Sequence, residues 1–197
     1  MTDSEWQYWI KQANYGDEKA FQTIYEQSKD HVYRTVTLLI DNKQDACDVV
    51  SEVYAELFKS LAKYDGCKPF RSWLTGLVIR QTRNWNRKLW RKFRLHERSK
   101  LLETEERTPD TEELFLQHEH QHELIALVYK LPYKLRSVVV LRYYQEHTFD
   151  EIAELLDIPS GTVKSRHHAA MAKLRKQAAH LIETNEGGLA PCPSKIN

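Results

Sequence analysis

Residues 148–166 read TFDEIAELLDIPSGTVKSR and contain the signals for two helices separated by a tight turn. Thr148 and Glu151, three residues apart, form a capping box, which satisfies free N–H groups at the start of a helix. The Asp-Ile-Pro sequence at 157–159 ends that helix, and Ser160 is suited to cap the next one. A short helix, a tight turn and a cationic helix predict a helix-turn-helix, a unit that reads DNA.

The second of these helices has an apolar side and a cationic side. Val163, Ala170 and Leu174 line up on the apolar side at helical spacing. His167 follows Val163 by four residues, so we expect it to pack inward against the first helix of the motif, whereas His168 faces outward toward DNA. Neighbours on a helix point about 100° apart, so this pair cannot share a metal ion. The outward side also carries Lys164, Ser165 and Arg175, with Arg166 flanking it.

Charge is distributed in blocks along the chain. The 197 residues have a formal net charge of +1, but positions 83–100 hold eight cations and one acid, a net charge of +7. Positions 101–123 hold eight acids and one cation, a net charge of −7. The first block is typical of a surface that binds a polyanion, and the second of a solvated connector.

Helical periodicity dominates the rest of the sequence, which predicts an all-α protein. Apolar residues recur at helical spacing from 17 to 40, Asn42 is suited to cap a second helix to about 61, and a loop at 64–69 precedes a helix of about 70–94. A charged stretch then interrupts the pattern, and such a linker leaves its flanking domains free to move relative to each other. We expect two small helical domains joined by a flexible linker: a domain at 1–96, an acidic linker at 97–114, a domain at 115–183 and a disordered tail at 184–197.

Composition argues against several classes of protein. No run of about 18 apolar residues could span a membrane, and the start of the chain lacks the features of a secretory signal, so we expect a cytoplasmic protein. Cys47, Cys67 and Cys192 are odd in number and far apart, as expected for reduced thiols rather than disulfides or a zinc site. No Gly-rich phosphate loop or nucleophile motif is present, so we predict neither an enzyme nor a resident cofactor.

The residues also leave two alternatives. One is a stand-alone helix-turn-helix regulator with an N-terminal sensing domain, which leaves the cationic, tryptophan-rich stretch at 70–94 unexplained. The other is a metal-dependent sensor or enzyme built on HEHQH at 118–122, where His118 and His122 share a helical face beside Glu119. Two histidines without a third ligand rarely hold zinc, so a solvated helix start is the simpler interpretation.

Two blocks of the sequence resemble one family. LPYKLRSVVVLRYYQEHTFDEIAELLDIPSGTVKSR at 131–166 resembles region 4 of the extracytoplasmic-function (ECF) sigma factors, the promoter-recognition subunits of bacterial RNA polymerase. DACDVVSEVYAELFKSL at 45–61 and FRSWL at 70–74 are similar to region 2 of that family. The resemblance implies a factor that binds core RNA polymerase, recognises −10 and −35 promoter DNA and directs promoter melting. It also implies control by an anti-sigma factor that wedges between the domains or wraps around them.

The resemblance assigns roles to residues of region 2. Family members dock on the polymerase clamp through an acidic helix, which implies core binding by Asp45, Asp48 and Glu52. The loop before the FRSWL-like helix captures a flipped −10 base, and the next helix lies along the melted strand. Cations and flat side chains suit single-stranded DNA. The residues implied in −10 binding are Tyr64, Asp65, Lys68, Trp73, Arg80, Arg83, Asn84 and Arg87, with Trp85 and Trp90 as further stacking candidates.

Region 4 of the family reads the −35 element with the second helix of its helix-turn-helix. This implies −35 binding by Ser160, Thr162, Lys164, Ser165, Arg166 and His168. The sequence departs from the family pattern at five positions, so we expect promoter choice or melting to differ in detail. Cys47 replaces a frequent acid, Gly76 and Arg80 replace the usual arginine and asparagine, His167 replaces an aliphatic residue and Ala169 replaces a frequent basic residue.

Overall fold

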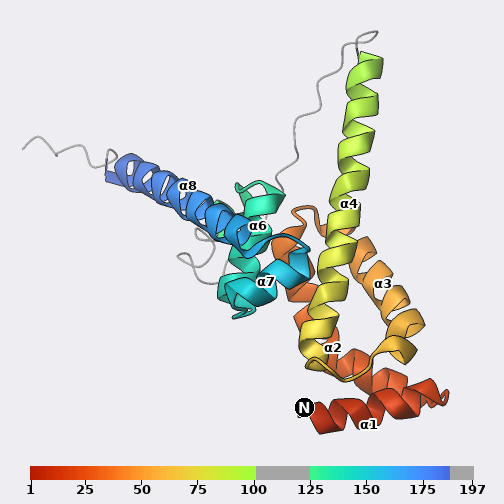
Figure 1. Ribbon diagram of the computed structural model, residues 1–197. Coiled ribbons are helices and arrows are strands. Elements are labelled where there is room, and N and C mark those ends of the chain that lie inside the picture. The colour runs from red at the N-terminus through yellow and green to blue at the C-terminus, as the bar shows by residue number, and fades with distance from the viewer. Residues whose placement is uncertain (101–124, 187–197) are drawn as a thin grey trace, which may run out of the picture.

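The structure, a computed structural model, describes residues 1–100 and 125–186, which are helical apart from short turns and loops (Figure 1). No strand is present among these residues, and the predicted all-α class is confirmed. The N-terminal unit contains α1 Asp3–Asn14, α2 Glu18–Leu39, α3 Lys43–Ser60, the 3-10 helix η1 Leu61–Lys63 and α4 Phe70–Lys100. The C-terminal unit contains a helical turn at 125–129, α6 Tyr133–Val139, the π-helical η2 Val140–Tyr144, α7 Phe149–Leu156 and α8 Ser160–Glu186.

The N-terminal unit is built around one apolar core. The predicted Asn42 cap of α3 is confirmed, because its Oδ1 accepts from the backbone N–H of Asp45 at 3.0 Å. α1 lies across the base of the unit (Figure 1), where the Trp6 ring packs on Phe70 with 4.5 Å between centroids. Each fully buried aliphatic side chain contributes about 1.5–3 kcal/mol. The core includes Ile10, Ile24, Val32, Val36, Val49, Val53, Leu57, Leu74 and Leu77.

The predicted loop between η1 and α4 is a defined turn held by its own hydrogen bonds. Tyr64 donates its hydroxyl to the carbonyl of Lys68 at 2.6 Å, and Asp65 Oδ1 accepts from the N–H of Cys67 at 2.9 Å. The hydrogen bond from the Cys67 backbone lowers the pKa of Asp65. Gly66 has a φ of 74°, which glycine adopts without strain. The loop therefore holds its polar groups in fixed positions next to the start of α4.

Two helices end later than the predicted domain boundaries. α4 continues to Lys100, so the first four positions of the predicted linker are helical, because neither proline nor glycine follows Gly76 in this stretch. α8 continues to Glu186, three residues into the predicted tail, and two glycines follow it. The rest of the linker, positions 115–124 of the predicted second domain and the rest of the tail lie outside the described residues.

The predicted helix-turn-helix is confirmed at α7 and α8. Thr148 Oγ1 accepts from the N–H of Glu151 at 3.3 Å, and the Glu151 carboxylate accepts from the N–H of Thr148 at 2.7 Å, which completes the capping box. Ser160 differs from the prediction, because it is the first residue of α8 and not its cap. The helix starts one residue earlier because the carbonyl of Pro159 already accepts from the N–H of Thr162 at 2.8 Å.

The two units pack against each other in this structure, an arrangement that the sequence did not predict. Leu39 at the end of α2 and Ile79 in α4 are buried in a cluster whose other members come from the C-terminal unit. Figure 1 shows α7 beside α4 and α6 beside α2. Removal of apolar area from water, rather than the linker, holds the units together. The C-terminal members are Val138, Val140, Leu141, Ile152, Leu156 and Val163.

Hydrogen bonds between the units surround this shared cluster. The hydroxyls of Tyr133 and Thr82 lie 2.9 Å apart, and burial raises the pKa of Tyr133, which keeps its hydroxyl neutral. Buried polar groups cost free energy unless they are paired, so these bonds favour one specific docking of the units. Further bonds join Tyr129 Oη to the carbonyl of Thr37 at 2.8 Å, Gln145 Nε2 to Thr35 Oγ1 at 2.8 Å, and Arg136 to Asp41.

His31 lies buried in α2 within a closed hydrogen-bond network. Arg71 donates its Nε–H to His31 Nδ1 at 3.2 Å, and His31 Nε2 lies 3.0 Å from Thr75 Oγ1. The Thr75 hydroxyl donates its own proton to the carbonyl of Arg71 at 2.8 Å, so its oxygen can only accept from His31. The imidazole proton is therefore on Nε2, and Nδ1 accepts from Arg71. Burial, followed by the positive charges of Arg71 and His147, lowers the pKa of His31 to about 4.

We expect acid to destabilise the protein through His31. The pKa of His31 is about 4 in the folded protein, whereas the ordinary value, which applies to the unfolded chain, is 6.5. Between these two pH values, unfolding is accompanied by the uptake of a proton. The contribution of neutral His31 to the free energy of unfolding is therefore fully present above about pH 6.5. It is lost as the pH drops toward 4, by about 3 kcal/mol in total. His31→Gln should flatten the free energy of unfolding in urea across this range, and the exposed-site control His168→Gln should not. Equal pH dependence in all three proteins would contradict the assignment.

Candidate nucleic-acid interface

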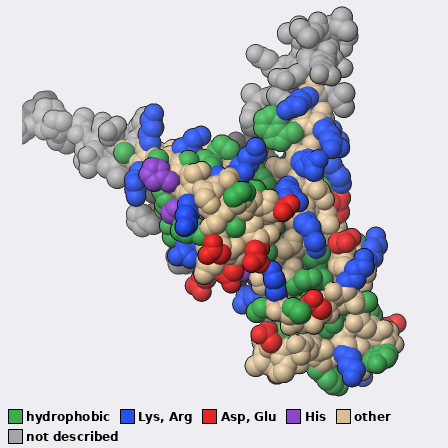
Figure 2. All heavy atoms as spheres, in the orientation of Figure 1, with side chains coloured by type: hydrophobic (Ala, Val, Ile, Leu, Met, Phe, Trp, Pro, Cys, Tyr) green, Lys and Arg blue, Asp and Glu red, His purple; other side chains and the backbone are tan. Residues whose placement is uncertain are grey.

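The start of α8 presents polar side chains to solvent. Lys164, Ser165 and His168 are exposed, as predicted, while Val163 and Ala170 are fully buried. Figure 2 shows blue cations and a purple histidine over this helix. The N-terminal turns of such a helix are the part that reaches base edges in a major groove. The outer face of α8 is therefore suited to contact duplex DNA.

His167 occupies the predicted inward position. Its Nε2 lies 2.9 Å from the Tyr143 hydroxyl, and its ring meets the Phe149 ring edge-on with 5.2 Å between centroids. Partial burial, together with the charge of Arg142, lowers the pKa of His167 and so favours the neutral ring. The adjacent histidines therefore differ in role: His167 fixes α8 against η2 and α7, and His168 faces solvent.

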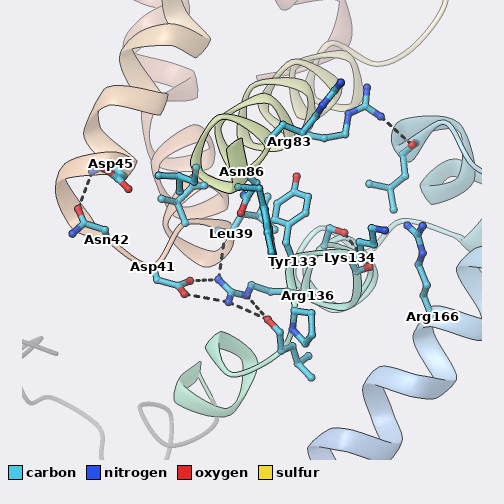
Figure 3. Close-up of a pocket in the computed structure, with 18 of the residues that line it drawn as sticks. Leu39, Asp41, Asn42, Asp45, Arg83, Asn86, Tyr133, Lys134, Arg136 and Arg166 are labelled. Carbon is cyan, nitrogen blue, oxygen red and sulfur yellow. Dashed lines mark hydrogen bonds and ion pairs between the residues drawn. The ribbon is translucent and has the colours of Figure 1, made fainter. Parts of the chain in front are cut away.

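Three of the predicted −35 residues are less exposed. Ser160, Thr162 and Arg166 are half-buried, and Ser165 Oγ donates to the carbonyl of Thr162 at 3.3 Å. Arg166 points from α8 toward the space between the two units and lines the cavity there (Figure 3). In this arrangement Arg166 lies beside the other unit rather than on the outer face with Lys164.

α4 carries a row of polar side chains that matches the predicted −10 surface. Arg80, Arg83, Asn84 and Arg87 follow at intervals of three, four and seven residues from the first, which places them on one face of the helix. Arg80, Asn84 and Arg87 are exposed, while Arg83 is half-buried and donates Nη1 to the carbonyl of Leu156 in α7 at 3.3 Å. Part of the row is therefore covered by the C-terminal unit.

A groove of about 530 Å³ lies where α7 meets α4. Lys68 forms an ion pair across it with Glu154, and both side chains are exposed. Figure 2 shows red acids gathered next to blue cations in this part of the surface. Carboxylates of one unit thus face cations that the resemblance assigns to DNA. The groove is lined by Lys68, Trp73, Gly76, Arg80 and Arg83 on one side and by Glu151, Glu154, Leu155 and Asp157 on the other.

The tryptophans of α4 differ in exposure. Trp73 packs at 5.3 Å from Tyr64 and 5.8 Å from Phe70, measured between ring centroids, and Trp85 also packs on the N-terminal core. Trp90 is 61% exposed. Of the two stacking candidates in the second half of α4, Trp90 is therefore the more exposed.

The predicted core-binding acids form a row on α3. Asp45, Asp48 and Glu52 are three and four residues apart and share a face of the helix. Asp48 is exposed, and within the described part of the chain its carboxylate has no hydrogen bond or ion pair. Glu52 pairs with Lys88 of α4 at 3.1 Å. Such a row suits a basic surface on a partner protein.

A second cavity, of about 820 Å³, lies between the units (Figure 3). Arg136 reaches into its wall from α6, is 6% exposed, and donates Nη1 to the carbonyl of Leu39 at 3.3 Å and Nη2 to that of Leu131 at 3.0 Å. It also pairs with Asp41. The sequence analysis did not single out Arg136; its position immediately before the apolar run SVVVL was the available signal.

The HEHQH motif at 118–122 lies outside the described residues. Within 1–100 and 125–186, no three histidine, cysteine or acidic side chains are grouped so that they could hold a metal ion. In the same ranges, no helix combines the length and the apolar character needed to cross a membrane.

Comparisons with known proteins match both units. The family described as Sigma-70 region 2 matches residues 24–92, and that described as Sigma-70, region 4 matches residues 127–176. The chain is 30% identical over 181 residues to the ECF RNA polymerase sigma factor SigW of Bacillus subtilis, which covers 87% of this chain and 96% of SigW. It is 25% identical over 183 residues to the ECF RNA polymerase sigma-E factor of Escherichia coli K12, which covers 88% of this chain and 94% of that protein.

Two solved structures share the fold. The structure of CnrH in complex with the cytosolic domain of CnrY matches with a TM-score of 0.59 and 21% identity, over 88% of this chain and 96% of that one. The sigma factor RpoE in complex with the anti-sigma factor NepR from Bartonella quintana matches with a TM-score of 0.60 and 16% identity, over 80% of this chain and 96% of that one. At these identities the likeness concerns the fold alone.

Proposed function

Because this chain belongs to the ECF family of RNA polymerase sigma factors, we propose that it docks on core polymerase through α3 and reads promoter DNA with α4 and α8. It is an alternative sigma factor, which binds core RNA polymerase, recognises −10 and −35 elements and directs promoter melting and initiation. The supporting observation is that one chain carries both a cationic, tryptophan-bearing α4 and a helix-turn-helix. A stand-alone regulator with a sensing domain does not account for the region 2 match.

The roles divide between the two units. The N-terminal unit, which we extend to the end of α4, takes core binding and the −10 element, and the C-terminal unit from 115 to the end of α8 takes the −35 element. This role needs no catalytic group, so the protein acts as a non-enzymatic factor, without a cofactor, in the cytoplasm where the polymerase works. Core contacts fall to Asp45, Asp48 and Glu52, −10 contacts to Tyr64, Asp65, Lys68, Trp73, Arg80, Arg83, Asn84 and Arg87, and −35 contacts to Ser160, Thr162, Lys164, Ser165, Arg166 and His168.

An anti-sigma protein is the proposed regulator. The CnrH structure is a complex with the cytosolic domain of CnrY, and the RpoE structure is a complex with the anti-sigma factor NepR. The cavity between the units supports the proposal, because exposed Leu89 and Trp90 lie beside the cations Arg87 and Lys134 on its walls. An amphipathic segment with acidic residues on its rim would match this combination of apolar and positive surface.

Transcription with core polymerase tests the proposed function. Bacterial core enzyme and a fragment library of the source genome would be incubated with and without the full chain, and transcript starts mapped. New starts that share two spaced motifs are expected. If the chain does not bind core polymerase, the assignment to initiation is wrong.

Removing the side chain of His168 should weaken −35 binding. His168 is exposed on the outer face of α8, so its ring can contact the DNA backbone, whereas the His167 ring packs inward against Tyr143 and Phe149. His168→Ala should lower affinity for a −35 duplex by at most about fivefold, the size of one exposed contact. Fluorescence anisotropy with wild-type protein and His168→Ala would measure it. If both proteins bind the duplex equally tightly, His168 does not contact DNA.

A further inference from the structure

In the groove between α4 and α7, cations that we propose to bind the −10 strand already contact oxygen atoms of the C-terminal unit. Lys68 pairs with Glu154, and Arg83 donates to the carbonyl of Leu156 at 3.3 Å. Glu151 and Asp157 also line the groove opposite Arg80. Carboxylate and carbonyl oxygens accept from cations as phosphate oxygens do. We propose that α7 is an internal competitor of the melted −10 strand, so that this strand binds only after the C-terminal unit leaves α4.

Arg83 is incompletely satisfied in the closed arrangement. Its Nε is buried and has no hydrogen-bond partner among the described residues, although its Nη1 contacts α7. A guanidinium offers a planar fork that suits two phosphate oxygens better than one carbonyl. A phosphate group could therefore accept more hydrogen bonds from Arg83 than α7 does in the closed arrangement. This difference favours replacement of α7 by DNA.

Gly76 provides the space for α7 to approach. A methyl group at this position would lie 3.5 Å from Cδ2 of Leu155, in ordinary contact, so a bulky side chain here would press against Leu155 of α7. Glycine is unfavourable in the middle of a helix compared with alanine, and this helix nevertheless has one where the units meet. The absence of a side chain at position 76 therefore lets Leu155 of α7 lie close to α4.

The apolar cluster shared by the two units stabilises the closed arrangement, in which α7 lies on α4. Leu39 and Ile79 are buried against apolar residues of the C-terminal unit, and the Tyr133–Thr82 bond lies at the same boundary. Opening therefore exposes apolar area, so core polymerase or DNA must supply binding free energy in the open state. The inference rests on the proposed function, since it takes α4 as the surface for the −10 strand.

Two substitutions at one position form the central test. Gly76→Ala and Gly76→Trp both remove the glycine, but only the tryptophan extends into α7. Binding of a short, mixed-sequence, fluorescein-labelled single-stranded DNA would be measured by anisotropy with each full-length protein. If about one molecule in ten of the wild type is open, Gly76→Trp should bind about tenfold more tightly, and Gly76→Ala should match the wild type. Circular dichroism would verify that both variants are helical.

A cross-link between Lys68 and Glu154 would report whether α7 lies on α4, because these residues form an ion pair in this arrangement. A carbodiimide joins a lysine amine directly to a contacting carboxylate, and peptide mapping would detect the 68–154 amide. We expect this cross-link in the wild type and in Gly76→Ala, and its loss in Gly76→Trp and on addition of the single-stranded DNA. The purified cross-linked protein should no longer bind that DNA.

A second pair of variants covers the case in which Gly76→Trp does not fold. Glu154→Lys places a cation against Lys68, whereas Asp150→Lys makes the same change of charge on an exposed part of α7 that does not line the groove. The first should tighten DNA binding more than the second. Equal binding by both, or tight binding by the cross-linked protein, would overturn the inference and leave the proposed function intact. If even the opened variants fail to bind single-stranded DNA, the −10 assignment of α4 is itself wrong.

Discussion

Replacing Arg136 with methionine should lower the free energy of unfolding by about 3 kcal/mol, because its guanidinium satisfies several buried carbonyl groups at once. The side chain is 6% exposed and donates to the carbonyls of Leu39, Leu131 and Tyr129. Methionine fills similar volume but donates nothing, so these carbonyls lose their partner without gaining water. Urea unfolding monitored by circular dichroism would measure the change.

Asp41→Asn is the control for Arg136→Met, because it removes the charge of the ion-pair partner and leaves the hydrogen bonds of Arg136 to backbone carbonyls in place. The Asp41 side chain is 62% exposed, so losing its charge should cost less than about 1 kcal/mol. A loss of stability in Arg136→Met no larger than that in Asp41→Asn would show that the carbonyl contacts contribute little. Because Arg136 joins α6 to the end of α2, the methionine variant should also show less of the 68–154 cross-link than Asp41→Asn.

Local sequence signals predicted the elements that carry the interface. The capping box at Thr148 and Glu151 and the Asn42 cap each depend on residues within three positions of each other, so the sequence alone specifies them. The inward position of His167 followed from its spacing after Val163 on one helix. These predictions succeeded because helix geometry fixes which neighbours along the chain share a face.

The docking of the two units could not be predicted in the same way. Leu39 and Ile79 read as ordinary core residues of their own helices, and nothing in their spacing shows that they are covered by α6 and α7. Arg136 lies 95 positions from Asp41. The linker composition suggested independent domains because it describes the flexibility of the connection, whereas the arrangement depends on complementary surfaces that are far apart in sequence.

Asp48→Lys should weaken binding to core polymerase by a factor of about 10 to 100, because a like charge placed against a basic partner surface costs several kcal/mol when it is desolvated. Asp48 is the clearest probe of the α3 row. Its carboxylate is exposed and has no partner within the described residues, whereas Glu52 already pairs with Lys88 of α4. Competition with a labelled sigma factor for core enzyme would give the affinity.

The matched control for Asp48→Lys is Glu26→Lys, which makes the same change of charge on α2 at an exposed pair with Lys29. This control should retain core binding to within about twofold, since an exposed pair contributes little. Binding of single-stranded DNA should be the same in both variants, because neither residue lines the groove between α4 and α7. Transcription should therefore fall with core affinity in Asp48→Lys alone. If Asp48→Lys binds core polymerase as tightly as the control, the docking surface does not include the exposed middle of α3.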